Sequence, residues 1–233
     1  AMERTVVPEN FSFRMTDEEY RVLEKIKNSI PVCYLADHAD FALGIVTGNN
    51  KKFLSAEKTE HSEMVLKGTD ICKYHINPAK QYLRFEPEQF QQVAPLEIYR
   101  APEKLLYRFI SNQLVVAYDD RQMLSLNSCN IVIPKIEGMQ IKYILAILNS
   151  SVSQFVYQKE FHSIKVLRAH MEHIPIPRVG KAIQNEIIAM PEPLICGMGK
   201  EAAETCQKRL DCRIMDLFRF SAEEQWIIRH ALH

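Results

Sequence analysis

The sequence LGIVTGNNKKFL, residues 43–54, places two short apolar runs on either side of a loop that is rich in amides and carries two lysines. Gly44 and Gly48 permit backbone conformations that other residues resist, and Asn49-Asn50 favours a turn with a positive φ. The pattern predicts a strand, a loop and a second strand. A polar hairpin with solvated lysines has the same pattern, so the stretch is interpreted together with the rest of the chain.

The chain of 233 residues is 47% hydrophobic and 25% charged, which is the composition of a soluble globular protein with one large domain or one and a half. No apolar run approaches the roughly 18–20 residues that a membrane span needs, and the N-terminus lacks a signal-peptide pattern. We therefore expect a cytoplasmic protein without a membrane partner. The Ala1-Met2 start is consistent with a scar at an excised segment, which would make the chain a piece of a longer protein.

Cysteines and charges narrow the possible functions only slightly. Six cysteines are scattered without a C-x-x-C pair or closely spaced Cys and His ligands, which argues against structural zinc and a disulfide framework. The total charge is zero, but residues 1–40 carry 5 basic and 8 acidic side chains, residues 41–181 carry 18 and 13, and residues 182–233 carry 6 and 8. The basic middle contains residues 43–54, although its surplus is too small to predict polyanion binding by itself.

Local signals predict an α+β fold. Capping boxes at Thr16 with Glu19 and at Ser221 with Glu224 predict two helix starts. Periodicity predicts further helices over residues 139–148, 182–190 and 201–220, and another one after the interruption at residues 149–151. Strand-like runs occupy residues 32–35, 43–47, 53–54, 81–85, 113–118 and 130–133, and the prolines hold residues 174–177 extended.

These elements predict a twisted mixed β-sheet with packed helices and a C-terminal helical segment. We divide the chain into an N-terminal arm and helix (1–30), a sheet domain (31–177) and a C-terminal helical segment (178–233). The arm is expected over residues 1–15. In the C-terminal segment, residues at helical spacing form an apolar stripe, which is more often core than a binding face: Leu210, Ile214, Leu217 and Phe218.

The order of these pieces resembles the TaqI-like C-terminal specificity domain, the target-recognition domain of adenine-specific DNA methyltransferases and type IIG restriction–modification enzymes. This domain is also related to the specificity subunits of type I restriction systems. The motifs that carry the resemblance are GIVTGNNKKF (44–53), LKGTDICKY (66–74), PEKLLYR (102–108), YILAILNS (143–150), IPIP (174–177) and the tail over residues 211–224. Glu103, and Arg219-Phe220 where the family has Tyr-Gly, depart from the family pattern.

The resemblance implies a domain that selects a sequence in double-stranded DNA and performs no chemistry. A methyltransferase or nuclease domain, upstream in the same chain or in a separate subunit, would then act on the DNA. S-adenosylmethionine and Mg²⁺ are expected only in that catalytic part. The chain agrees with this division, because it has no glycine-rich cofactor loop and its nearest string to N-P-P-Y is Asn77-Pro78-Ala79-Lys80.

Candidate DNA contacts fall into two groups. Cations expected to neutralise phosphates are Lys51, Lys52, Lys73, Lys104, Arg108 and Lys165. Amide and guanidinium groups suited to base edges are Asn49 and Asn50 for adenine, and Arg84, Arg121 and Arg168 for guanine; Thr47 of the same loop completes the set. For each of these side chains the alternative is a solvated group without a DNA contact.

Other functions find less support in the sequence. The acidic cluster Asp119-Asp120-Arg121 lacks the E-x-K partner of a nuclease and fits a turn, and the residues His170-Met171-Glu172-His173 lack a third metal ligand. A hydrolase would need a nucleophile–base arrangement such as G-x-S-x-G, which is absent from the sequence. The remaining alternative is a protein-interaction module that docks a catalytic subunit or homodimerises through the C-terminal helices.

Overall fold

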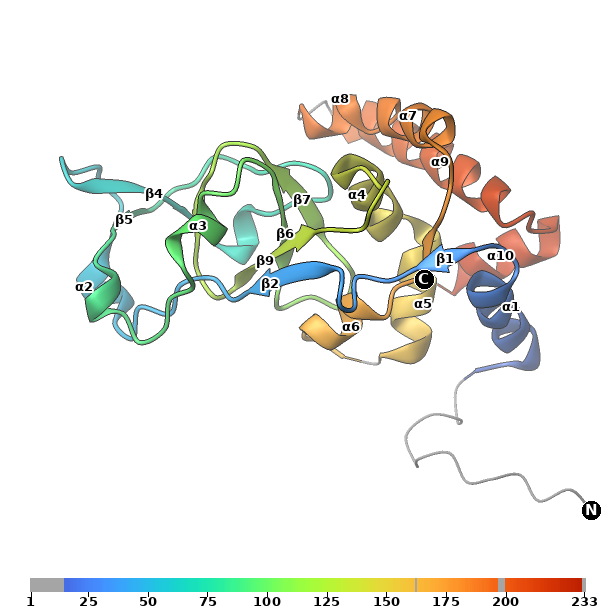
Figure 1. The fold of residues 1–233 in the computed structure, drawn as a ribbon, viewed down its shortest axis with the longest axis horizontal. Helices are drawn as coiled ribbons and strands as arrows, with labels where there is room; N and C mark the ends of the chain where they lie inside the picture. Colours follow the sequence, from blue (N-terminus) through green and yellow to red (C-terminus); the bar gives the residue numbers. More distant parts are fainter. Residues whose placement is uncertain (1–14, 162, 197–199, 232–233) are drawn as a thin grey trace, which may run out of the picture.

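The structure, a computed structural model, describes residues 15–161, 163–196 and 200–231 (Figure 1). Helices and strands are both abundant, so the predicted α+β class is confirmed. Except for Met15, the predicted N-terminal arm lies outside the described residues. Among the described residues, no helix has both the length and the apolar character needed to cross a membrane.

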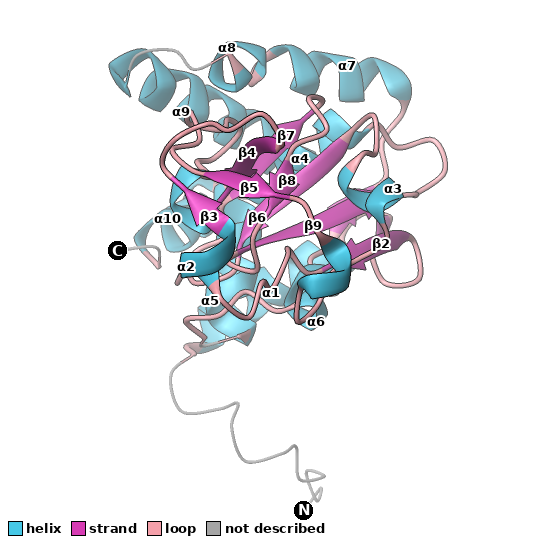
Figure 2. Cartoon of the chain, turned by 90° about the vertical axis from the view of Figure 1, so that its left-hand side faces the viewer, coloured by secondary structure: helices cyan, strands magenta, loops and turns pink. Residues whose placement is uncertain are grey.

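The strands form two four-stranded sheets and one two-stranded pair. Figure 2 shows the strands of the two larger sheets. The first sheet is antiparallel throughout, with the order β2 (Ala39–Ala42), β9 (Cys129–Pro134), β6 (Lys104–Arg108) and β7 (Val116–Asp119). The second has the order β3 (Leu54–Ser55), β5 (Tyr82–Arg84), β4 (Ser62–Leu66) and β8 (Leu124–Ser125), and its β4–β8 pair is parallel. The two-stranded pair joins β1 (Val32–Cys33) to β10 (Ile176–Pro177).

Ten helices and two 3₁₀ turns are seen in the described part of the chain. The longer helices gather at one end of the molecule in Figure 1: α1 (Asp17–Asn28), α4 (Ile141–Asn149), α5 (Ser151–Glu160), α7 (Lys181–Ala189), α9 (Lys200–Leu217) and α10 (Ala222–His230). The short ones are α2 (Asn50–Phe53), α3 (Leu96–Tyr99), α6 (Arg168–Glu172), α8 (Glu192–Ile195), η1 (Gly68–Asp70) and η2 (Pro87–Gln89). Both predicted capping boxes are confirmed, with the Thr16 and Ser221 hydroxyls accepting from the backbone of Glu19 and Glu224.

Side chains of the first sheet alternate between two separate cores. On β6, Leu105 and Tyr107 face the larger core, whereas Leu106 faces the smaller one. Successive residues of a strand point to opposite faces, so a strand that is buried on both sides contributes to both cores. The first sheet is therefore the layer that joins the helical end of the molecule to the second sheet.

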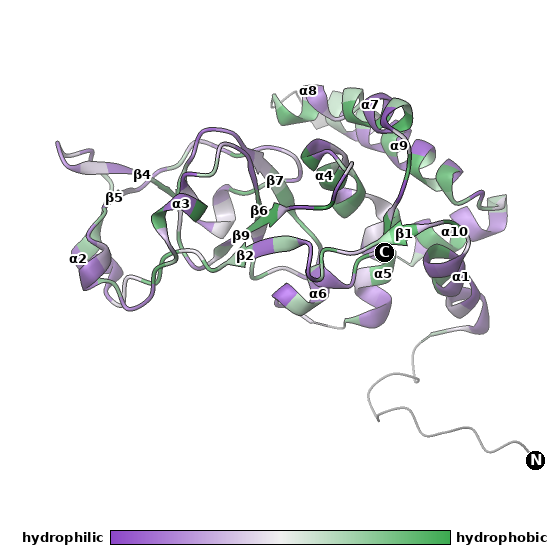
Figure 3. Ribbon diagram, viewed as in Figure 1, coloured by the Kyte–Doolittle hydropathy of each residue, from purple (hydrophilic) through white to green (hydrophobic). Residues whose placement is uncertain are grey.

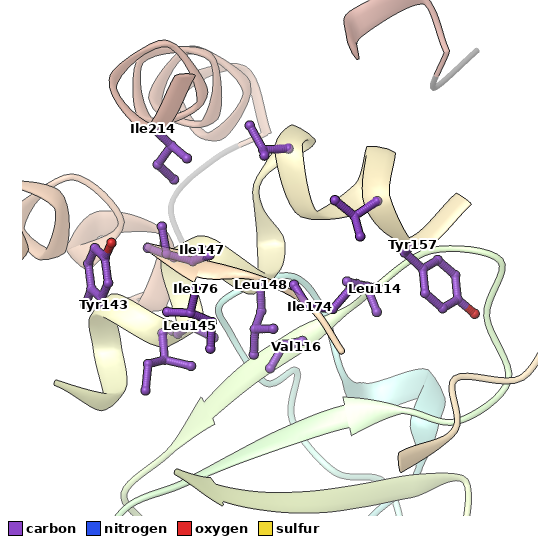
Figure 4. Packing of buried hydrophobic residues seen from close by; sticks show 14 of the residues in the cluster. Leu114, Val116, Tyr143, Leu145, Ile147, Leu148, Tyr157, Ile174, Ile176 and Ile214 are labelled. Atoms are coloured by element: carbon purple, nitrogen blue, oxygen red, sulfur yellow. The ribbon is translucent and has the colours of Figure 1, made fainter. Parts of the chain in front are cut away.

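The larger core lies between the first sheet and the long helices. Figure 4 shows Leu148 of α4 beside Val116, with Tyr143, Leu145 and Ile147 farther along and Ile214 of α9 on the opposite side of the cluster from Val116. This core draws residues from α1 and from α4 to α10, so it crosses residue 177. The predicted division into three segments stays a prediction. Leu210, Ile214 and Phe218 are at most 2% exposed. The apolar stripe is therefore occupied by the chain's own core and is not free to dock a partner.

The smaller core supports the opposite end of the molecule. It contains Phe53 of α2, Leu83 of β5, Tyr99 of α3, Leu106 of β6 and further apolar residues of both four-stranded sheets. The elements around it are short, and Figure 3 shows that hydrophilic residues dominate the ribbon around α2 and β4 at this end, whereas apolar residues are frequent in the helices at the other end. This polar end is the part of the molecule that carries residues 43–54.

Candidate nucleic-acid interface

Residues 43–54 do not form the predicted strand, loop and strand. Ile45 and Val46 make only isolated bridges, to Leu126 and Gln92. The loop instead becomes the one-turn helix α2, because the Asn49 side chain accepts a hydrogen bond from the backbone N–H of Lys52 at 3.2 Å. Only the final part of the prediction holds, where the chain continues into β3.

Two glycines fix the path of the chain into α2. A Cβ atom at position 44 would lie 2.1 Å from the carbonyl oxygen of Leu126, so this position admits only glycine. Gly48 has a φ of +76°, and a Cβ atom there would lie 3.3 Å from that of Gln91. The close packing at Gly44 and the left-handed turn at Gly48 together direct α2 away from the body of the sheet.

A glutamine-rich segment lies beside α2. The backbones of Val46 and Gln92 exchange two hydrogen bonds, and the Lys52 ammonium donates to the side-chain oxygen of Gln89 at 2.8 Å. Phe90 anchors the segment through an edge contact with Phe53, with ring centroids 5.2 Å apart. We use the term tip surface for the exposed residues that meet here: Asn49, Asn50, Lys51, Lys52, Gln89, Gln91 and Gln92.

The sequence did not identify the glutamines as site residues, since they lie about 40 residues away from α2 along the chain. The run QFQQ at residues 89–92, bounded by prolines at positions 87 and 95, was the available signal, but it also fits a plain polar connection. Its pairing with Val46 is a tertiary contact that the local pattern does not encode.

The tip surface continues into a groove of about 670 Å³ between β2 and residues 92–98. Gln92 and Arg168 both line this groove. The Arg168 guanidinium lies 5.1 Å from the centre of the Phe41 ring and forms an ion pair with Glu172 at 2.7 Å. Arg84, at the end of β5, is largely exposed and pairs with Glu86 at 2.7 Å, next to η2. The structure thus places two of the predicted arginines near the tip surface.

The prediction for Lys104 is wrong, whereas that for Arg108 stays a prediction. Lys104 is fully buried, and its ammonium donates to the Asp119 carboxylate and to the Tyr99 carbonyl oxygen. Arg108 directs its guanidinium to the carbonyl oxygens of Gly68 and Ile71. Lys104 stabilises the interior, because a buried charge needs a partner inside the protein, and it is not available to a phosphate. Arg108 is half-buried.

Thr47 also fails as a direct DNA contact, because it is only 3% exposed. Its hydroxyl donates to the side-chain oxygen of Asn50 at 2.6 Å and so positions that amide at the surface. Thr47 is therefore a supporting residue of the tip surface.

Three further predicted cations lie elsewhere. Lys73 is half-buried in a cavity with Asp211 of α9, and burial lowers the pKa of its ammonium while the nearby Asp211 carboxylate opposes that shift. Arg121 is exposed on the turn after β7, and Lys165 is exposed beside Ile110. Within the described residues, no hydrogen bond or ion pair joins these three to the tip surface.

The side chains of the acidic cluster at Asp119 and of the histidine cluster at His170 have partners within the protein. Asp119 accepts hydrogen bonds from the backbone of Arg121 and Met123 and pairs with Lys104, as expected for turn chemistry. His170 accepts from the backbone N–H of Leu167 through Nδ1 and stacks on Phe161. Over the described ranges, no group of three His, Cys, Asp or Glu side chains is arranged to hold a metal ion.

Comparisons with known proteins identify a family and several similar folds. Residues 63–176 match the family model of the TaqI-like C-terminal specificity domain, which confirms the resemblance predicted from the motifs. No curated protein matches the chain by sequence.

Among solved structures, the chain is similar to the type IIL restriction–modification enzyme MmeI in complex with DNA, with a TM-score of 0.56, 11% identity, and 82% of this chain and 34% of that chain covered. It is also similar to a chain of a type I restriction–modification system, with a TM-score of 0.48, 12% identity, and 93% of this chain and 52% of that chain covered. The type IIG restriction endonuclease BpuSI is similar too, with a TM-score of 0.48, 10% identity, and 87% of this chain and 33% of that chain covered. This chain therefore spans between a third and about half of the length of these proteins.

Proposed function

We propose that this chain, which over residues 63–176 belongs to the TaqI-like C-terminal specificity domain family, binds double-stranded DNA through its tip surface and selects the sequence at which a restriction–modification enzyme acts. The observation that carries the proposal is the meeting of Asn49, Asn50 and three glutamines with Lys51 and Lys52 on one exposed surface. Amides and lysines together supply both base-reading groups and phosphate partners.

The carboxamides and the lysines of the tip surface would have different roles in DNA binding. A carboxamide can form two hydrogen bonds with the N6 and N7 atoms of adenine, and each such pair is worth about 1–3 kcal/mol of discrimination. Lys51 and Lys52 would contact phosphates and supply affinity that falls as salt rises. Arg168 and Arg84 are placed to extend the contact on either side. To do so, each would leave its ion pair, with Glu172 and Glu86 respectively, and bind the DNA.

The packing beneath the surface supports a reading role. The Asn49 side chain is held by its hydrogen bond to the first turn of α2, and the Asn50 side chain by its hydrogen bond from the Thr47 hydroxyl. The Phe90 ring packs against Phe53. Preorganised polar groups lose less conformational entropy on binding than free side chains do. The tip surface is therefore suited to discriminate between base pairs.

Catalysis is assigned to a separate part of the system. We place an adenine-specific methyltransferase domain, a nuclease domain or both upstream in the same polypeptide or in another subunit, together with their S-adenosylmethionine and Mg²⁺. The buried Lys104–Asp119 pair and the partnered His170 supply structural contacts. The interaction-module alternative is weakened, since the apolar stripe it would use is buried within the chain.

The test compares duplex binding by the double variant Lys51→Ala/Lys52→Ala with that of the unaltered chain. A random-sequence duplex library first identifies a preferred sequence, and fluorescence anisotropy then measures affinity between 50 and 200 mM salt. Two lost phosphate contacts should reduce the slope of log K against log salt by about 1.8. Asn49→Ala should instead reduce the preference for the selected sequence, together with a small loss of helix-cap stability.

The matched control is Lys181→Ala/Arg209→Ala, which removes two exposed cations from α7 and α9. It changes the net charge equally and should leave both the slope and the preferred sequence unchanged. An equal loss of affinity in the two double variants would show that only the net charge matters. A library without any preferred sequence would contradict the proposal.

A further inference from the structure

A second polar cavity lies away from the tip surface, where the loop after η1 meets α5, α9 and α10. Its volume is about 560 Å³, and it shares no lining residue with the tip surface. The residues on which the argument depends are Lys73, Ser151, Gln158, Lys208, Asp211 and Arg229. The cavity thus joins a loop of the smaller core's region to three helices of the larger core.

Ser151 is buried in the wall of the cavity. Ser151, the first residue of α5, is 8% exposed, and its hydroxyl has no hydrogen-bond partner among the described residues. Its backbone N–H is used, donating to the Asp211 carboxylate at 2.8 Å. The hydroxyl is closed off from solvent and lies close to the same carboxylate, whose pKa it lowers, so Ser151 helps to hold Asp211 and does not itself face the cavity.

The charges around the cavity favour an anion. Lys73, Lys208 and Arg229 line it, against the single carboxylate of Asp211. The Lys73 ammonium has one long contact, 3.4 Å to the Asn149 carbonyl oxygen. Lys208 and Arg229 take part in no ion pair within the described part of the chain, and Arg229 contacts only Gln225 and the Cys212 sulfur, both at 3.4 Å. Three incompletely paired cations therefore surround one space.

Burial of Lys73 adds to this argument. Removal from water lowers the pKa of the Lys73 ammonium, and Asp211, whose own pKa burial raises, compensates only in part. An additional anion in the cavity would stabilise the charged form of Lys73. The Lys73 ammonium, which burial destabilises, would therefore favour the binding of an anion.

We propose that this cavity is a binding site for the phosphate group of a small molecule, held by Lys73, Lys208 and Arg229. The volume exceeds that of a phosphate ion and leaves room for an attached organic group. Gln113 and Gln158 line the remaining space, and their side-chain amides make no hydrogen bond within the described residues. Free phosphate and a mononucleotide share the recognised chemistry, and the site is independent of the proposed DNA contact.

The test measures the melting temperature of the chain with inorganic phosphate, adenosine monophosphate or chloride at constant ionic strength. A ligand present at 100 times its Kd should raise the melting temperature by at least about 5 °C for a protein of this size. Lys208→Ala/Arg229→Ala should abolish the shift, because it removes two exposed cations. Lys181→Ala/Arg209→Ala should retain the shift. A larger shift with the mononucleotide would identify a nucleotide as the ligand class.

Three outcomes overturn the proposal. They are the absence of a saturable shift with both phosphate compounds, an equal shift in the Lys208→Ala/Arg229→Ala variant, and a loss of duplex affinity in that variant. The last outcome would make the cavity part of the DNA surface. Failure of the tip surface to bind DNA would leave the phosphate result unaffected, so the two proposals fail separately.

Discussion

The two faces of the first sheet pack against cores of different chemistry. The face toward the helices is apolar along its inner strands, with Leu105 of β6 and Val116 of β7 packed on α4. The face toward the tip surface combines Leu106 and Ala117 with the buried ion pair of Lys104 and Asp119. The helical end is thus stabilised mainly by apolar burial, whereas the polar end combines a smaller core with specific polar contacts.

This difference accounts for the division of roles between the two ends. Long helices that bury a wide apolar face form a rigid support. Strands of two to five residues and one-turn helices leave more backbone and polar side chains at the surface, as in α2 and η2. The polar end can therefore present recognition groups because the other end supplies most of the apolar burial.

The largest expected effect comes from removing Lys104. Lys104→Ala leaves the Asp119 carboxylate buried without its cation, which should lower the free energy of unfolding by about 3–5 kcal/mol. Urea denaturation measures this loss. The control is Lys135→Ala, which breaks the exposed pair with Asp40 and should cost less than about 1 kcal/mol. Similar losses of unfolding free energy in the two variants would show that the buried Lys104–Asp119 pair stabilises the protein no more than an exposed pair does.

A smaller effect is expected from substitutions in the two cores, which should differ in their consequences for DNA binding. Leu83→Ala in the smaller core and Leu148→Ala in the larger core each remove a fully buried side chain and should each cost about 2–4 kcal/mol. Only Leu83→Ala should weaken DNA binding and increase hydrogen exchange over residues 45–55 and 82–92, because β5 supports the tip surface. Hydrogen-exchange mass spectrometry provides the measurement. Equal exchange in these segments in both variants would contradict separate roles.

The smallest effect concerns an ion pair between α1 and α10. Burial raises the pKa of Glu224, but hydrogen bonds from Lys25 and from the Ser221 backbone outweigh burial, so the folded pKa lies below the ordinary value of 4.5. The associated stability is therefore present above about pH 4.5 and is lost as the pH falls through the folded pKa. Glu224→Gln should cost about 0.5–1 kcal/mol at pH 7 and less below pH 4. A difference that does not change with pH, measured by urea denaturation, would contradict this assignment.

Local signals predicted much of the helical end from the sequence. Thr16 and Ser221 start their helices through contacts only three residues away, and the apolar spacing of residues 139–148 marks α4. The polar end was harder to predict, because α2 is a single turn that depends on one Asn49 cap and on a segment 40 residues away.

Lys104 shows why a candidate contact chosen from the sequence can fail. It was interpreted as an exposed loop cation, but it is the first residue of β6 and shares a face with Leu106. Its partner Asp119 lies directly opposite on β7, so the charge is compensated across a strand pair. Residues 104–108 read KLLYR and show no polar–apolar alternation that would mark Lys104 as buried. The pairing register that places Asp119 beside Lys104 does not follow from the local pattern either.

The close packing at Gly44 has a consequence for changing what the protein recognises. Since a side chain at this position would collide with the Leu126 carbonyl oxygen, the place where the chain leaves the sheet is fixed, whatever follows it. Residues 47–52 and 86–92 are joined through Val46 and Gln92 and rest on Phe53 and Phe90. New specificities should therefore be obtained by exchanging these two segments as a pair and leaving the junction glycine unchanged.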